Sequence, residues 1–289
     1  MKVELIQERA FTVRTGTKAI HGLFHVSEWE GLNKYQDNAG RTLILNDGQI
    51  VKGSPELLAS LTDVPAGFVQ VPETKLPNGL VVPTFKVAQH VSGKDEDGNL
   101  LLDGTCKPWT NISFFDAQKA CEEYEYGFIT ETQWLAIAYD LSQQDCNWTG
   151  GKVGEGYIFQ GIRNGVGAKS GDYVPTDSTE RRWMTLSNGS KICDMNGNVF
   201  QWIFDDVQGN DKGVIAKAFE AHSPSLTTAG YPSETKGVGY RPGAGNNWSG
   251  NALIRGGCWV SVGNAGVFYL DRGLPGSGNG CIGFRCTLP

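Results

Sequence analysis

The chain has 289 residues with a net charge of -6, and 19% of its residues are charged. This acidic balance, without a Lys/Arg cluster, argues against a nucleic-acid-binding protein, and no apolar run approaches the roughly 18 residues that cross a bilayer. Hydrophobic residues at 39%, with 39 Gly and 8 Trp, indicate a folded protein whose long loops are held by aromatic side chains.

Residues 1–65 are predicted to form a β-rich accessory or assembly region. Residues 11–14 and 42–45 are typical of strands, and Asn46-Asp47-Gly48 favours a hairpin turn because Asp-Gly tolerates positive φ. Proline then recurs at positions 65, 72, 77 and 83, so we place a domain boundary near residue 65. The rest of the chain, residues 66–289, is expected to be one domain.

Two helices are predicted in the second domain. Ser113 can cap the first, with Asp116 in its first turn, and Thr130 can cap the second, with Gln133 completing a capping box. From residue 147 onward the pattern indicates short strands and long loops, and five interleaved tryptophans favour ordered loops: Trp148, Trp183, Trp202, Trp248 and Trp259.

A metal or other cofactor is not expected. The seven cysteines contain no C-x-x-C pair, so a structural zinc site is not indicated. His21 and His25 are four residues apart, but Gly22 and the strand-like pattern around them argue against a helix that would bring both to one metal.

Four motifs occur in one order along residues 66–289. They are T-E-T-Q-W at 130–134, D-M-N-G-N-V-F-Q-W at 194–202, R-G-G-C-W at 255–259 and G-F-R at 283–285. Together they resemble the formylglycine-generating, sulfatase-modifying branch of the C-type-lectin fold. The resemblance implies an α+β, C-type-lectin-like domain with two helices, a small twisted antiparallel sheet and long ordered loops, after the short β-rich N-terminal region.

The motif residues are expected to be structural. Gly256 and Gly257 allow close backbone approach, the tryptophans bury large areas, and the arginines reach carbonyls or carboxylates across the loops. The expected frame consists of Trp202, Arg255, Gly256, Gly257, Trp259, Gly283, Phe284 and Arg285.

The chain departs from the enzymes of this family. Their two copper-binding thiols align here with Ser261 and Gly266, neither of which is a soft thiolate ligand. Calcium-binding members use a glutamate where this chain has Gln201, a weaker ligand. An oxidase or sulfoxide synthase that uses Cys258, Cys281 or Cys286 stays as the alternative function, but no basic neighbour that would activate a thiol is evident.

The composition of residues 237–289 is unusual. They contain no Lys, Glu, Gln or Met, whereas the first 236 residues contain forty-five. About ten would be expected at that rate. The segment also resembles the variable proteins of diversity-generating retroelements. In these systems template adenines are randomised, so an AAY codon becomes NNY, which cannot encode those four residues.

This resemblance implies a variable region at about 256–285, between the frame residues. Its expected ligand-binding positions are Cys258, Val260, Ser261, Val262, Gly263, Tyr269, Asp271, Arg272, Gly273, Gly276, Gly278, Gly280 and Cys281. An aromatic side chain beside charged ones is typical of a recognition surface.

We therefore expect a binding protein and not an enzyme. Its expected partner is a protein or glycan on a target-cell surface, with virion tail proteins as further partners and neither nucleic acid nor membrane insertion involved. The N-terminal residues carry acids where a signal peptide needs an apolar stretch, so none is seen. A virion tail or a displayed surface protein is the expected location.

Overall fold

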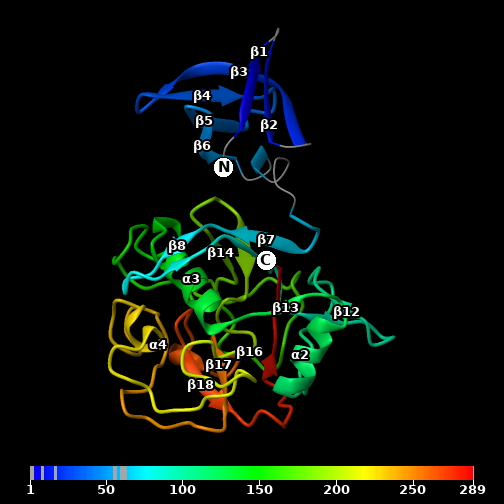
Figure 1. Cartoon of the computed structure of the whole chain (residues 1–289), viewed down its shortest axis with the longest axis vertical. Coiled ribbons are helices and arrows are strands. Elements are labelled where there is room, and N and C mark those ends of the chain that lie inside the picture. Colours follow the sequence, from blue (N-terminus) through cyan, green and yellow to red (C-terminus); the bar gives the residue numbers. More distant parts are fainter. Residues whose placement is uncertain (1–2, 8–9, 16–17, 55–56, 59–63, 289) are drawn as a thin grey trace. The chain divides into compact units, whose positions relative to one another are not determined.

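The computed structural model describes residues 3–7, 10–15, 18–54, 57–58 and 64–288 (Figure 1). The chain divides into two compact units: Met1–Pro65 with Asn188–Ser190, and Ala66–Ser187 with Lys191–Pro289. Among the described residues, no helix combines the length and apolar character needed to cross a bilayer.

The first unit is built on one six-stranded antiparallel sheet, in which each strand pairs with the next along the chain. Its strands are β1 (Glu4–Gln7), β2 (Phe11–Thr15), β3 (Lys18–Trp29), β4 (Leu32–Gln36), β5 (Thr42–Asn46) and β6 (Gln49–Gly53). Asp47 and Gly48 both have positive φ, 44° and 72°, in the turn between β5 and β6. The predicted strands and hairpin turn are thus present. His21 and His25 both lie on β3, although the His21 side chain is outside the described part of the chain.

The first sheet of the second unit brings the end of the chain into its middle. Its order is β13-β20-β10-β7, with all neighbours antiparallel. The strands are β7 (Phe68–Val71), β10 (Phe85–Ala88), β13 (Gly127–Phe128) and β20 (Cys286–Leu288). Three two-stranded ribbons accompany it: β8 (Thr74–Lys75) with β9 (Val81–Val82), β11 (Gly93–Lys94) with β12 (Leu100–Leu101), and β14 (Trp183–Thr185) with β15 (Lys191–Cys193).

The second sheet carries the C-terminal motifs. Its order is β18-β17-β16-β19, and its strands are β16 (Phe200–Ile203), β17 (Ala252–Arg255), β18 (Leu270–Gly273) and β19 (Ile282–Gly283). β19 runs parallel to β16, and the other pairs are antiparallel. The α+β class holds, but the prediction of a single small antiparallel sheet is corrected to two sheets, one of them mixed. The parallel pair arises because residues 274–281 cross from one edge strand to the other.

Both predicted helices are present with the predicted caps. α2 (Phe114–Glu122) begins after Ser113, whose Oγ accepts from the Asp116 backbone N–H at 3.1 Å. α3 (Glu131–Ser142) begins with the complete Thr130–Gln133 capping box. Shorter helical segments in residues 64–288 include α4 (Pro224–Thr227), η1 (Asp145–Asn147) and η2 (Val262–Asn264). η2 lies inside the expected variable region and was not predicted.

Tryptophans anchor the loops by burial and by their indole N–H groups. Trp202 donates to the carbonyl of Ile112 at 3.1 Å, and Trp134 of α3 donates to the carbonyl of Val267 at 2.8 Å. Trp148 and Trp248 are also buried, whereas Trp183 and Trp259 are only partly covered. A buried indole that keeps its hydrogen bond fixes a loop in one place, which explains order without regular strands.

Candidate binding site

Arg255 is the first part of the buried frame. It ends β17 and is fully buried, and its Nε donates to Glu131 Oε2 at 3.0 Å while its Nη2 pairs with Glu131 Oε1. Its Nη1 donates to the carbonyl of Phe268 at 2.9 Å. One guanidinium therefore joins the start of α3, the end of β17 and the loop before β18, with its charge balanced by a carboxylate.

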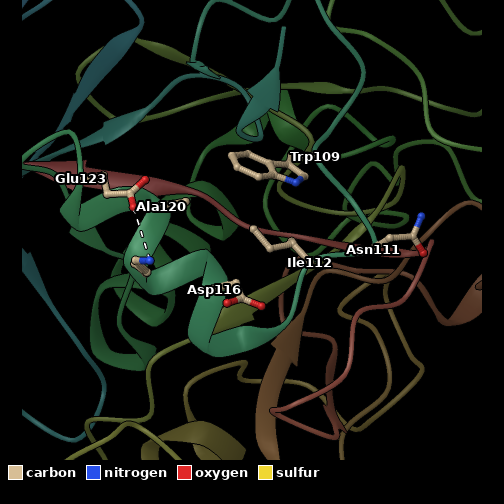
Figure 2. A pocket seen from close by; sticks show the side chains of 7 residues that line it. Trp109, Asn111, Ile112, Asp116, Ala120 and Glu123 are labelled. Carbon is tan, nitrogen blue, oxygen red and sulfur yellow. Dashed lines mark ion pairs between the residues drawn. The ribbon is translucent and has the colours of Figure 1, made fainter. Parts of the chain in front are cut away.

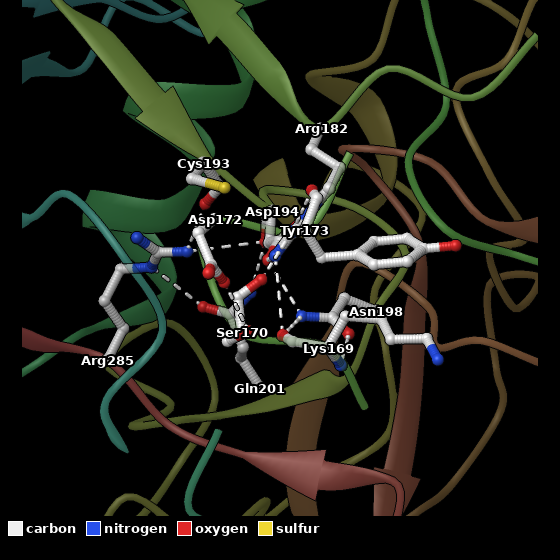
Figure 3. A network of polar contacts seen from close by, with 10 residues as sticks. All are labelled: Lys169, Ser170, Asp172, Tyr173, Arg182, Cys193, Asp194, Asn198, Gln201 and Arg285. Atoms are coloured by element: carbon white, nitrogen blue, oxygen red, sulfur yellow. Dashed lines mark hydrogen bonds and ion pairs between the residues drawn. The ribbon is translucent and has the colours of Figure 1, made fainter. Parts of the chain in front are cut away.

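Arg285 is the second part (Figure 3). It donates to Gln201 Oε1 at 2.9 Å and to the carbonyls of Ala88 and Cys193 at 2.6 and 2.7 Å. Burial lowers the pKa of Arg285 to about 10, so it stays charged at neutral pH. The contacts of both arginines with carboxylate, carbonyl and amide oxygens agree with the role expected from a planar fork of donors.

A third buried arginine, Arg182, was not singled out from the sequence. Its Nε and Nη2 donate to the two carboxylate oxygens of Asp194 at 2.8 and 2.6 Å, at the centre of the network in Figure 3. Asn198 Nδ2 donates to the same carboxylate at 2.8 Å, and Asn198 Oδ1 accepts from the Lys169 backbone at 2.8 Å. Little in the sequence indicated this role, because Arg182 follows Arg181 in a loop-rich stretch and belongs to none of the four motifs.

The residues around Gln201 do not fit a calcium site. The Gln201 amide is used at both ends, since Nε2 donates to the carbonyl of Asp194 at 2.7 Å and Oε1 accepts from Arg285. The nearby carbonyl of Cys193 also accepts from Arg285. Oxygens that would coordinate a hard cation are thus bound to a guanidinium.

The paired glycines of the R-G-G motif are required where they stand. Gly256 and Gly257 have φ of 91° and 87°, a region that other residues rarely adopt. A Cβ on Gly257 would lie 2.9 Å from Ala265 Cα. Gly283 and Phe284 are buried as well, so the expected frame lies in the interior except for Trp259, which is partly covered.

Most of the expected ligand-binding positions face water. Val260 and Val262 are 59% and 61% exposed. The other exposed positions are Gly263, Arg272, Gly276 and Gly278, and the partly exposed ones are Ser261, Asp271, Gly273, Gly280 and Cys281. Two expectations of a water-facing side chain are wrong: Cys258 is 1% and Tyr269 is 9% exposed. Cys258 lies under the turn whose Ser261 Oγ accepts its backbone N–H at 2.8 Å.

Two of the glycine positions leave no room for a side chain, which corrects the expectation that they vary freely. A Cβ on Gly273 would lie 2.5 Å from the Trp202 ring, and one on Gly278 would lie 2.4 Å from the Asn111 backbone. By contrast, no atom of the described residues, apart from the chain neighbours, lies within 4 Å of a Cβ on Gly263 or Gly276. The first pair therefore belongs to the frame, and the second pair can carry any side chain outward.

The structure also places two aromatic residues that the sequence did not single out, Phe200 and Tyr240, beside Tyr269. The Tyr269 ring lies 5.2 Å from that of Phe200 and 5.8 Å from that of Tyr240. Backbone bonds hold this cluster together, because Tyr240 accepts from Leu270 at 2.8 Å and Cys281 accepts from Phe200 at 2.9 Å. Three further expected positions lie close to this cluster: Cys258 and Asp271 near Tyr269, and Cys281 beside Cys258.

The surroundings of Cys281 and Cys286 do not favour the alternative function, an oxidase. Burial and the neighbouring Cys258 raise the pKa of Cys281 to about 11, which keeps this thiol protonated at neutral pH. Cys286 is buried, with its Sγ 2.7 Å from that of Cys121, whose pKa is raised by burial. A thiolate nucleophile needs the opposite shift.

One pocket borders the same region (Figure 2). Its volume is about 340 Å³, and its walls are Trp109, Asn111, Ile112, Asp116, Lys119, Ala120 and Glu123. Asn111 donates to the carbonyl of Asn279 at 3.0 Å, so the pocket lies beside the loop that contains Gly278 and Gly280. Its lining comes from α2, the loop before it and the residue that follows it, and from none of the expected ligand-binding positions.

The site is thus a loop-built face on an α+β domain whose buried arginines hold the loops in place. Residues 78–288 match the sulfatase-modifying factor enzyme 1-like domain, and the chain belongs to this family. The resemblance inferred from the four motifs is confirmed.

Comparison with solved structures gives distant likenesses. Treponema denticola variable protein 1 is 14% identical, with 77% of this chain and 94% of that one covered and a TM-score of 0.43. For the U1 variant of the Major Tropism Determinant the values are 15% identity, 89% and 63% coverage and a TM-score of 0.41. CarF is 14% identical, with 78% of this chain and 98% of that one covered and a TM-score of 0.42. Comparison with curated proteins returned no match.

Proposed function

We propose that the chain is a binding protein whose C-terminal face, within residues 256–285, recognises its ligand through interchangeable side chains. The observation that carries the proposal is the separation of roles along this segment. Arg255, Gly257 and Arg285 are buried and engaged, while Val260, Val262 and Arg272 between them are exposed. Substitution at exposed positions on a rigid frame changes recognition with little effect on stability.

The composition of the tail supports diversification by a retroelement as the source of this variety. Residues 237–289 lack Lys, Glu, Gln and Met, which randomised AAY codons cannot produce as NNY. The open space around Gly263 and Gly276 is what a position that receives different side chains requires. Gly273 and Gly278 are left out of the proposed variable set because a side chain would collide there.

The proposed ligand is a protein or glycan on a target-cell surface, and the proposed setting is a virion tail or a displayed surface protein. A face built from loops of mixed apolar and polar character suits macromolecular recognition more than enclosure of a small molecule. The acidic balance of the chain supports a partner other than nucleic acid.

The gene provides the test. A near-copy of the stretch encoding residues 256–285 is expected close by, with AAY codons at the exposed positions and a reverse transcriptase gene beside it. A flanking genome that lacks both would overturn diversification.

Binding is favoured over thiol oxidase chemistry because the Cys281 thiol has a raised pKa and Cys286 is buried. Titration of the reduced protein with Cu(I), followed by thiol labelling, separates the two functions. The proposal predicts no stoichiometric protection of Cys258 and Cys281, and tight uptake of one Cu(I) per chain would favour the oxidase.

A further inference from the structure

Asp271 is a carboxylate without a cationic partner. Its Oδ1 accepts from the Arg272 backbone at 2.9 Å, but its Oδ2 has only the Tyr269 hydroxyl, at 3.4 Å. In the described part of the chain no Lys, Arg or His nitrogen forms an ion pair with it. Asp271 is also the one acidic residue in positions 237–289.

The neighbouring arginine is engaged elsewhere. The Arg272 guanidinium lies over the Trp248 ring, 4.7 Å from its centroid, and Trp248 is buried against Phe219. The positive charge of Arg272 thus favours the ionised form of Asp271, while its guanidinium lies on the Trp248 ring. Burial nevertheless raises the pKa of Asp271 above its ordinary value, so the group lacks full solvation.

The Tyr269 hydroxyl links this carboxylate to a cluster of three aromatic rings. Tyr269 is tilted by 57° to Phe200 and by 55° to Tyr240, and the latter two rings are partly exposed. Aromatic faces carry negative potential and attract ammonium and guanidinium groups within about 6 Å. A half-buried carboxylate linked to such rings through Tyr269 offers both components of a cation-binding site.

We propose that Asp271 with Phe200, Tyr240 and Tyr269 binds a lysine or arginine side chain of a protein partner. This inference rests on the proposed binding function and names the chemistry of one contact in it. Oδ2 accepts one long hydrogen bond, from the Tyr269 hydroxyl, and a carboxylate oxygen can accept a second. A primary ammonium or a guanidinium supplies an N–H group for it, which a quaternary ammonium does not. A neutral glycan would leave the carboxylate without a counter-charge, so a basic protein side chain is favoured.

The test uses the full chain and two matched tripeptides, acetyl-Gly-Lys-Gly-amide and the same peptide with norleucine in place of lysine. Amide chemical shifts in two-dimensional NMR report binding and its position. The lysine peptide should shift resonances of residues around 200, 240 and 271 in a saturable way, and the norleucine peptide should bind at least fivefold more weakly. A trimethyl-lysine peptide should also bind more weakly than lysine.

Asp271→Asn is the decisive variant, and Asp211→Asn, at an exposed aspartate outside this cluster, is its control. Asp271→Asn should weaken binding of the lysine peptide at least fivefold and melt no lower than the parent, because it removes an unpaired charge. Tyr240→Leu should weaken binding at least threefold. Equal binding of the lysine and norleucine peptides, equal or stronger binding of trimethyl-lysine, or unchanged binding by Asp271→Asn would overturn the inference.

A lower melting temperature of Asp271→Asn with unchanged peptide binding would assign Asp271 a structural role, which also contradicts the inference. The proposed function is judged separately, by the flanking gene and by tolerance of substitution at Val260, Val262 and Gly276. If the peptide test fails and those tests succeed, the cation contact is rejected and the proposed binding function is kept.

Discussion

Glu131 and Arg255 form an ion pair although 124 residues separate them, and both side chains are fully shielded from water. The pair connects the first residue of α3 with the last residue of β17. Arg255 stands directly before the segment proposed to vary, so this contact fixes where the binding face begins.

Breaking this pair should destabilise the domain strongly. Arg255→Ala leaves the Glu131 carboxylate buried without a partner, and such losses cost about 3–5 kcal/mol. Urea unfolding monitored by tryptophan fluorescence measures the free energy of unfolding. Lys217→Ala, which removes an exposed pair with Glu220, is the control and should change it by less than about 0.5 kcal/mol. Equal effects of the two variants would contradict the role of the buried pair.

The glycines of the C-terminal segment should divide into two classes. Gly273→Ala and Gly278→Ala place a methyl group against the Trp202 ring and the Asn111 backbone, so each should lower the free energy of unfolding by about 1–3 kcal/mol. Gly263→Ala and Gly276→Ala meet open space and should change it by less than about 0.5 kcal/mol. Four similar melting temperatures would refute this division.

Asp205 should make stability depend on pH. It is buried, and its Oδ1 accepts from the backbones of Val207 and Gln208. Its Oδ2 has no hydrogen-bond partner among the described residues, and burial raises its pKa to about 6. Because the folded-state pKa lies above the unfolded one, its contribution to stability is present below about pH 4 and is lost as pH rises through about 6.

Asp205→Asn keeps the oxygen that accepts both backbone bonds and removes the charge. Its free energy of unfolding should exceed that of the parent by about 2–3 kcal/mol above pH 7, and the difference should vanish near pH 4. Denaturant unfolding of both proteins across this range measures the difference. A difference that does not change with pH would show that ionisation of Asp205 is not its source.

Calcium should have no effect on stability, because Arg285 and Gln201 already use the oxygens near Asp194. A specifically bound ion raises the melting temperature in proportion to the logarithm of its concentration, so unfolding in ~5 mM calcium and in ~5 mM chelator should agree within about 1 °C. A consistent rise with calcium would reveal a site.

The sequence predicted the elements that depend on local chemistry. Ser113 and Thr130 cap the two helices as expected, and the R-G-G motif marks a close backbone approach. The helix caps depend on side chains within a few residues of each other, and the close approach depends on the absence of a Cβ. Both can therefore be predicted from the order of residues alone.

The remainder depends on contacts between distant segments. Arg182 pairs with Asp194, and Phe200 meets Tyr240 and Tyr269, through loops whose course no local pattern encodes. For the same reason Gly273 and Gly276 are indistinguishable in sequence. Only the position of the Trp202 ring makes one of them a frame residue and leaves the other open.

Two displayed libraries sorted for protease resistance can show whether a stable frame carries interchangeable side chains. One randomises five exposed positions: Val260, Val262, Gly263, Arg272 and Gly276. The other randomises five frame positions: Trp202, Gly257, Gly273, Phe284 and Arg285. Most members of the first library should stay folded, and few members of the second should. Loss of folding to a similar extent in both libraries would contradict it.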